Sequence, residues 1–225
     1  MSGSESGGAV SESDAGPQTP GGPCTPGEAW AKLAHGNDRF VAGEYSHPNQ
    51  DAARRDSLTG GQTPFAVFFG CADSRVAAEI IFDRGLGDLF VVRTAGHVID
   101  PGVLGSIEFG VDILNIPLVV ILGHDSCGAV SATVDAVRDG VFPGGYIRDI
   151  VERVMPSVLA ARQAGMSTPD EIEAEHVRQT LRLLTERSRL IADRVASGRL
   201  AIVGAVYNLG DGRARIVDSA GLDPE

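Results

Sequence analysis

The sequence predicts an α/β fold in which a mostly parallel central sheet is flanked by helices and ends in an antiparallel C-terminal edge strand. Apolar runs rich in Val, Ile and Phe alternate with amphipathic stretches along most of the 225 residues. Runs of this kind are typical of parallel strands that are buried on both faces. The last two runs flank the turn Gly210-Asp211-Gly212, which predicts a hairpin and therefore the antiparallel edge strand.

The first 26 residues differ in composition from the rest of the chain. Residues 1–26 are dominated by Gly, Ser and Pro and carry no basic side chain. Such a segment buries too little apolar surface to offset the entropy of ordering, so we expect residues 1–26 to be a disordered tail and residues 27–225 to form a single domain. The segment Thr25-Pro26-Gly27-Glu28 has the spacing of a capping box and predicts a helix start. The apolar face of that helix would carry Trp30, Leu33, Ala34, Phe40 and Val41.

From residue 65 onward the predicted strands and helices alternate, which favours a parallel sheet. The predicted strands cover residues 65–69, 89–93, 117–122, 200–207 and 213–217. The predicted helices cover residues 77–83, 103–114, 128–138, 146–164 and 169–196. The helices present more apolar surface than one small sheet needs, so we expect a dimer or a larger assembly.

Charge and cysteine content exclude several classes of function. The net charge of −11 gives no basic surface for nucleic acid or anionic membranes. No stretch approaches the ~20 apolar residues of a membrane span. The first residues show no basic segment followed by an apolar one, so we expect no secretory signal. Three cysteines form no disulfide framework, and Cys24 stands alone in the predicted tail. We therefore expect a cytoplasmic protein without nucleic-acid or membrane partners.

Two predicted strands end in short polar segments that carry metal-binding side chains. Residues 70–75 (GCADSR) follow the first strand, and residues 123–128 (GHDSCG) follow the third. Functional groups of parallel sheets gather beyond the carboxyl ends of the strands, so these segments should converge. Two thiols and one imidazole make a ligand set of catalytic zinc sites that keep an open fourth position. The candidate zinc ligands are Cys71, His124 and Cys127.

Other interpretations of the same residues remain open at this point. Each Cys or His taken alone is more typical of a buried structural side chain than of a ligand. A metal-free enzyme could use Cys71 or Cys127 as a nucleophile with His124 as its base. The convergence of two strand ends favours the metal site over both alternatives.

Asp73 and Arg75 form the second part of the candidate site. Their alternating positions put both side chains on one side of the loop that follows Cys71. A guanidinium keeps a carboxylate ionised and oriented, so Asp73 could accept the hydrogen bond of a zinc-bound water. Released from Arg75, the same carboxylate could ligate the zinc and block the open position. A plain surface ion pair is the simpler alternative.

The two segments resemble the motifs of the β-class carbonic anhydrases. The likeness extends from about Glu28 to Val217 and includes FVVR at residues 90–93 and SIEF at residues 106–109. It implies one Zn²⁺ per chain on the three candidate ligands, with Asp73 and Arg75 as the catalytic pair. It also implies reversible hydration of carbon dioxide to bicarbonate by zinc-bound hydroxide, in a homodimer or homotetramer.

The resemblance further implies a substrate pocket and a possible regulatory site. The substrate-binding positions would be Gln62, Val76, Phe90, Phe109 and Gly128, with Phe109 replacing the usual Tyr of one subgroup. Another subgroup binds regulatory bicarbonate through a Trp, an Arg and a Tyr. Arg93 and Tyr207 match two of these, but Phe68 replaces the Trp, which argues against such regulation. His97 stands where Asn is expected and is interpreted as a buried His or a proton relay.

Two further functions use the same site. A hydrolase of a carbon dioxide analogue such as carbonyl sulfide would need the same zinc centre with a different pocket. A catalytically silent zinc-binding regulatory protein would hold Asp73 permanently on the metal, which the intact Asp73–Arg75 pair argues against.

Overall fold

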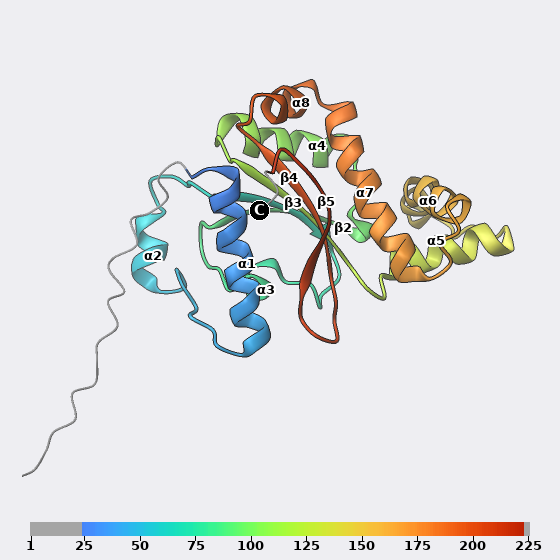
Figure 1. Cartoon of the computed structure of the whole chain (residues 1–225), viewed down its shortest axis with the longest axis horizontal. Helices are drawn as coiled ribbons and strands as arrows, with labels where there is room; N and C mark the ends of the chain where they lie inside the picture. Colours follow the sequence, from blue (N-terminus) through green and yellow to red (C-terminus); the bar gives the residue numbers. More distant parts are fainter. Residues whose placement is uncertain (1–23, 223–225) are drawn as a thin grey trace, which may run out of the picture.

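A five-stranded sheet forms the centre of the computed structural model, which describes residues 24–222 (Figure 1). The strand order is β2-β1-β3-β4-β5; the first four strands run parallel, and β5 runs antiparallel to β4. The strands are β1 (Ala66–Cys71), β2 (Leu89–Thr94), β3 (Leu118–His124), β4 (Ala201–Tyr207) and β5 (Ala214–Ala220). This arrangement confirms the predicted fold class.

Helices cover both faces of the sheet and leave β1 and β3 completely buried. The α-helices are α1 (Pro26–Ala42), α2 (Ala52–Ser57), α3 (Ala78–Ile81), α4 (Pro101–Glu108), α5 (Gly128–Asp139), α6 (Ile147–Gln163), α7 (Pro169–Arg187) and α8 (Arg189–Ala196). Helices α1 and α3 pack on one face, and α4, α7 and α8 pack on the other. Because successive strand residues point to opposite faces, Phe68 contacts the α1 side while Phe69 contacts the α4 and α7 side. This double burial explains why β1 and β3 are almost entirely apolar.

The predicted capping box starts α1. The Thr25 hydroxyl accepts a hydrogen bond from the Glu28 N–H at 3.2 Å, and the Glu28 carboxylate accepts one from the Thr25 N–H at 2.7 Å. On the helix, Leu33 is buried, and Trp30 and Phe40 pack against the core more loosely.

The predicted tail, residues 1–26, lies outside the described residues apart from its last three positions. Of these, Cys24 is half-buried and packs against the core, although the sequence places it alone in the tail. Pro26 is already the first residue of α1.

Two helix predictions need correction, and one helix was not predicted. The single helix predicted for residues 169–196 is two helices, because Ser188 adopts extended backbone angles and its hydroxyl caps α8 by accepting from the Ile191 N–H. The helix predicted for residues 103–114 begins earlier, at Pro101 behind the Asp100 cap, and its last turn, Phe109–Ile113, is a π-helix. Helix α2 was not predicted from the sequence.

The long β1–β2 and β2–β3 connections put all four parallel strands in the same direction, so the carboxyl ends of β1 and β3 meet at one edge. A short 3₁₀ turn (Ala95–His97) follows β2 at that edge. Within the described residues, no helix is both long and apolar enough to cross a membrane.

Candidate metal centre

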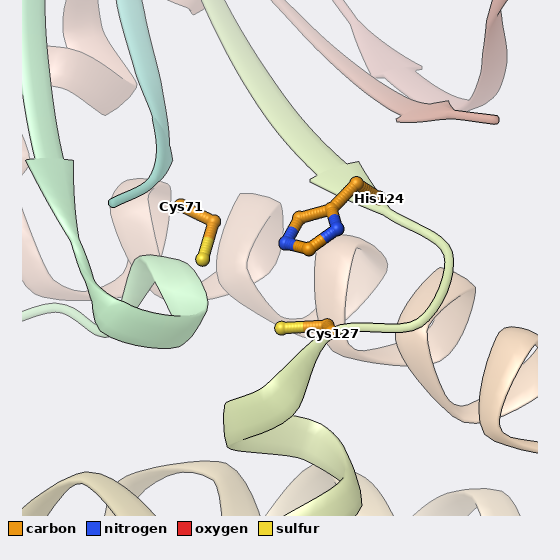
Figure 2. A group of neighbouring side chains, drawn as sticks. All are labelled: Cys71, His124 and Cys127. Carbon is orange, nitrogen blue, oxygen red and sulfur yellow. The ribbon is translucent and has the colours of Figure 1, made fainter. Parts of the chain in front are cut away.

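Three sulfur and nitrogen donors converge where β1 and β3 end. Cys71 is the last residue of β1, His124 is the last residue of β3, and Cys127 directly precedes α5. Their ligand atoms all lie within 4.8 Å of one another, and all three residues are buried. Figure 2 shows both sulfur atoms and one ring nitrogen directed toward a common point. The structure thus brings together the three ligands that the sequence predicts.

The imidazole of His124 is oriented for metal binding. Its Nδ1 lies 2.8 Å from the carbonyl oxygen of Asp125, which can only accept, so Nδ1 carries the proton. The Nε2 atom therefore has a free lone pair, and it is buried without a hydrogen-bond partner. A buried orphan nitrogen facing two thiols fits a metal ion, because a metal-binding His commonly donates its other ring N–H to a carbonyl.

The two thiols share an environment that stabilises negative charge at Cys71. The contact with Cys127 and the N–H of Gly96, 3.4 Å from Sγ, lower the pKa of Cys71 to about 4. The same contact raises the pKa of Cys127, since a thiolate already stands beside it. A divalent cation would favour the second thiolate as well, so this pair matches the charge that such an ion requires.

Asp73 and Arg75 form an ion pair next to these donors. Arg75 donates from Nε to Oδ1 at 2.9 Å and from Nη2 to Oδ2 at 2.7 Å, and its backbone N–H also donates to Oδ1. These hydrogen bonds hold the pKa of Asp73 well below its usual range. The Asp73 Oδ2 atom lies 3.9 Å from Nε2 of His124, so the carboxylate borders the donor cluster while Arg75 holds it.

Arg93 fixes the backbone that carries this pair. Its Nε donates to the carbonyl of Cys71 at 2.8 Å, and its Nη2 donates to the carbonyl of Asp73 at 2.6 Å. Tyr207 lies opposite His124 in the β3–β4 register, and Phe68 is buried in the core on the α1 side. Arg93 therefore supports the loop through backbone contacts, a role that the sequence analysis did not assign.

Of the residues implied for substrate binding, Phe90 and Phe109 are the two shown in contact with each other. Phe90 and Phe109 stack with ring centroids 6.1 Å apart, and Phe109 is 46% exposed. Val76 is completely buried in the core on the α1 side. Gln62 is exposed in the segment before β1, and Gly128 is the exposed first residue of α5.

A buried polar cluster behind the donors was not identified from the sequence. Glu173 of α7 accepts a hydrogen bond from the His124 N–H at 3.2 Å, and burial raises the pKa of Glu173 to about 8. His97 is completely buried, its ring centroid lies 4.4 Å from that of His176, and burial lowers the pKa of both imidazoles. The available signal was the buried stripe of α7, where polar residues alternate with apolar ones: Ile172, Glu173, His176, Val177, Thr180, Leu181 and Leu184.

The fold and the donor set together are those of an α/β protein with a candidate metal centre. The family model described as carbonic anhydrase matches residues 66–214. Carbonic anhydrase 2 of Mycobacterium tuberculosis is 61% identical over 196 residues, which cover 87% of this chain and 95% of the relative. The carbonic anhydrase of Mycolicibacterium smegmatis is 60% identical over 191 residues, or 85% of this chain and 93% of the relative.

The fold is also shared with solved structures. One of two tetrameric β-carbonic anhydrases from Sordaria macrospora is 24% identical, with a TM-score of 0.64, and the likeness covers 84% of this chain and 91% of that one. This chain belongs to the carbonic anhydrase family, and to its β class. The comparisons confirm the predicted family and enzyme class.

Proposed function

We propose that the protein hydrates carbon dioxide reversibly to bicarbonate and a proton on one zinc ion held by Cys71, His124 and Cys127. The observation that carries this proposal is the convergence of these three buried donors beside the Asp73–Arg75 ion pair. Membership of the carbonic anhydrase family supports this reaction, and the three donors could bind the zinc ion that it needs.

Zinc is the metal that this donor set favours. Two thiolates and one imidazole form one of the ligand sets of catalytic zinc sites, and soft sulfur ligands disfavour magnesium or calcium. When bound, zinc supplies the Lewis acidity that makes water a nucleophile near neutral pH. The predicted carbon dioxide chemistry would use that property, with Cys71, His124 and Cys127 holding the metal.

Asp73 orients the reacting water, and Arg75 keeps Asp73 available for that task. Both carboxylate oxygens of Asp73 are occupied by Arg75 donors, which direct the carboxylate toward the guanidinium. Because the pKa of Asp73 is held well below its usual range, the group is ionised at neutral pH and acts as a hydrogen-bond acceptor. Without Arg75, Asp73 would become a fourth metal ligand, since Oδ2 is already 3.9 Å from the His124 nitrogen.

The substrate side of the site is proposed to be apolar. The stacked rings of Phe90 and Phe109 offer a dry surface for a neutral linear molecule such as carbon dioxide. Gln62 and the N-terminus of α5 at Gly128 offer hydrogen-bond donors for the bicarbonate anion, and Val76 shapes the wall from the core side. Phe109 lacks the hydroxyl that Tyr would bring, so the pocket relies on the other donors.

We further propose a cytoplasmic homodimer or homotetramer. The tetrameric relative in fold supports this assembly, and so do exposed apolar side chains beside edge strand β2, such as Phe109 and Ile113. The cysteines of the described residues are all free thiols, as expected for a reducing compartment. The catalytic domain is proposed to be the single domain predicted for residues 27–225, extended by Thr25 and Pro26, which cap and begin α1.

The test is metal content and carbon dioxide hydration measured on the same purified full-length protein. We expect about one zinc per chain, with activity lost in Cys71→Ser in proportion to lost zinc. Cys24→Ser is the matched control and should keep both zinc and activity, because Cys24 lies outside the donor cluster. Full activity in zinc-free protein would refute the proposal and favour a thiol nucleophile. Hydrolysis of carbonyl sulfide without carbon dioxide hydration would favour the analogue hydrolase.

A further inference from the structure

A cavity of about 280 Å³ lies between α6 and α7, and neither Asp73 nor Arg75 is among its lining residues. These two helices pack side by side at one end of the molecule (Figure 1). Val98 and Ile99, which follow the 3₁₀ turn after β2, close a third wall. The α7 residues that line the cavity follow the i, i+3, i+4, i+7, i+11 pattern of one helix face: His176, Gln179, Thr180, Leu183 and Arg187.

Two arginines give the cavity a cationic side. Arg187 is the last residue of α7 and makes no ion pair within residues 24–222. Arg153 is fixed in place because its Nη1 donates to the Ile99 carbonyl at 2.9 Å and its Nε donates to Asp149 at 2.8 Å. The only acidic lining residue, Glu152, already accepts from Arg148 at 2.6 Å. The lining side chain whose charge has no ion-pair partner among the described residues is therefore the cationic Arg187.

The inner part of the cavity is built from buried polar side chains. Ser157 and His176 are 2% and 4% exposed, and the Ser157 hydroxyl lies 2.8 Å from His176 Nδ1. His176 Nε2 must be the donor to the Gly96 carbonyl, 2.9 Å away, so Ser157 donates to Nδ1. These groups are satisfied within the protein and give the cavity a fixed inner surface.

The same groups link the cavity to the metal centre. Gly96, whose carbonyl accepts from His176, donates its own N–H to Sγ of Cys71 at 3.4 Å. A ligand packed on His176 is thus separated from a candidate zinc ligand by a single residue, Gly96. The metal centre and the cavity are therefore neighbours, and both contact Gly96 in the 3₁₀ turn Ala95–His97.

We propose that this cavity binds a small organic anion with one carboxylate and a short apolar chain. The carboxylate would be bound by Arg187 and by the free Nη2 of Arg153, because guanidinium groups recognise carboxylates through paired hydrogen bonds. The apolar chain would lie against Val98, Ile99 and Leu183. A volume of 280 Å³ corresponds to about nine water volumes at ~30 Å³ each, which suits a ligand larger than bicarbonate.

The test uses hexanoate as the probe on zinc-loaded full-length protein, with binding measured by equilibrium dialysis. Arg187→Ala should weaken hexanoate binding about tenfold or more, since a charge-assisted contact is lost. Arg189→Ala is the matched control, because Arg189 is also an exposed arginine but does not line the cavity. The neutral analogue hexanamide should also bind about tenfold more weakly than hexanoate.

The position of the probe is checked by NMR of labelled methyl groups. Hexanoate should shift the methyl signals of Val98, Ile99 and Leu183 in the wild-type protein and in Arg189→Ala. Equal affinity in wild type and Arg187→Ala would overturn the proposal, because it would put the carboxylate elsewhere, such as at the zinc. Absence of binding at roughly 10 mM hexanoate would overturn it as well. Neither readout depends on catalytic activity, so the result is separate from the fate of the proposed function.

Discussion

Arg75 donates two side-chain hydrogen bonds to the Asp73 carboxylate, of 2.9 and 2.7 Å, while Oδ2 of the same carboxylate lies 3.9 Å from Nε2 of His124. Asp73 therefore stands between a guanidinium and a metal-binding cluster. The guanidinium side is occupied in this structure. In the proposed mechanism, the balance between these two partners would decide whether a bound metal keeps a position for water.

Replacing Arg75 with Ala should lower the rate of carbon dioxide hydration about ten- to a hundredfold, because Asp73 loses charge-assisted hydrogen bonds and moves onto the metal. Zinc content should stay unchanged. Stopped-flow kinetics with metal analysis checks both points. Arg215→Ala is the control, since it breaks an exposed ion pair with Asp211 in the C-terminal hairpin. Wild-type rates in Arg75→Ala would show that the Asp73–Arg75 pair is only a surface ion pair.

Gly123 should not tolerate a side chain. A Cβ atom there would lie 2.4 Å from Oε1 of Glu173 and 2.6 Å from a methyl of Val177. Gly123→Ala should destabilise the fold by about 2 kcal/mol through overpacking and should speed zinc loss, because Glu173 holds the His124 N–H. Gly105→Ala in α4 meets nothing within 4 Å and should be neutral or stabilising. Chemical denaturation and zinc release to a chelator measure both effects; equal stability of the two variants would contradict this packing argument.

The buried imidazoles should make the fold sensitive to acid. Burial lowers the pKa of His176 to about 4, whereas an unfolded His titrates near 6.5. Between these values the unfolded chain binds the proton and the folded chain does not, so stability falls as the pH falls. His176→Gln should reduce the loss of unfolding free energy between pH 7 and pH 5 by about 2 kcal/mol.

Urea denaturation at both pH values and one protein concentration measures this change. His35→Gln, at an exposed position of α1, should behave as the wild type. The prediction fails if His176→Gln keeps the full acid sensitivity. The lowered pKa of His97 acts in the same direction, so part of the sensitivity should remain in the variant. The raised pKa of Glu173 has the opposite effect. Because the folded chain holds this proton more tightly than the unfolded chain, the free energy of unfolding falls as the pH rises toward about 8.

The parts of the structure that could be predicted are those with a local cause. Strands β1 and β3 are almost entirely apolar because both of their faces are covered, and α1 begins where Thr25 and Glu28 cap each other. The convergence of Cys71 with His124 follows from parallel strands that end at a shared edge. Each of these inferences needed only residue type, spacing and a general rule of sheet topology.

The missed features depend on contacts between distant residues. Ser188 breaks a helix that periodicity alone would continue, because its hydroxyl caps α8 and also donates to Glu108 of α4. Glu173 is 49 positions from His124 in sequence, yet it supports the backbone of that ligand. Arg93 binds the Cys71 and Asp73 carbonyls from the neighbouring strand β2. The sequence pattern places Glu173 among apolar residues of one helix face, but it does not indicate that His124 is its partner.

The most direct test of this account is X-ray absorption at the zinc edge of the full-length protein as purified. We predict about one zinc per chain with two sulfur ligands at ~2.3 Å and one imidazole nitrogen at ~2.0 Å. In Cys127→Ser the sulfur count should fall to one, whereas Cys24→Ser should keep both sulfur ligands. A zinc ion without sulfur ligands, or an active protein that contains no zinc, would contradict the account.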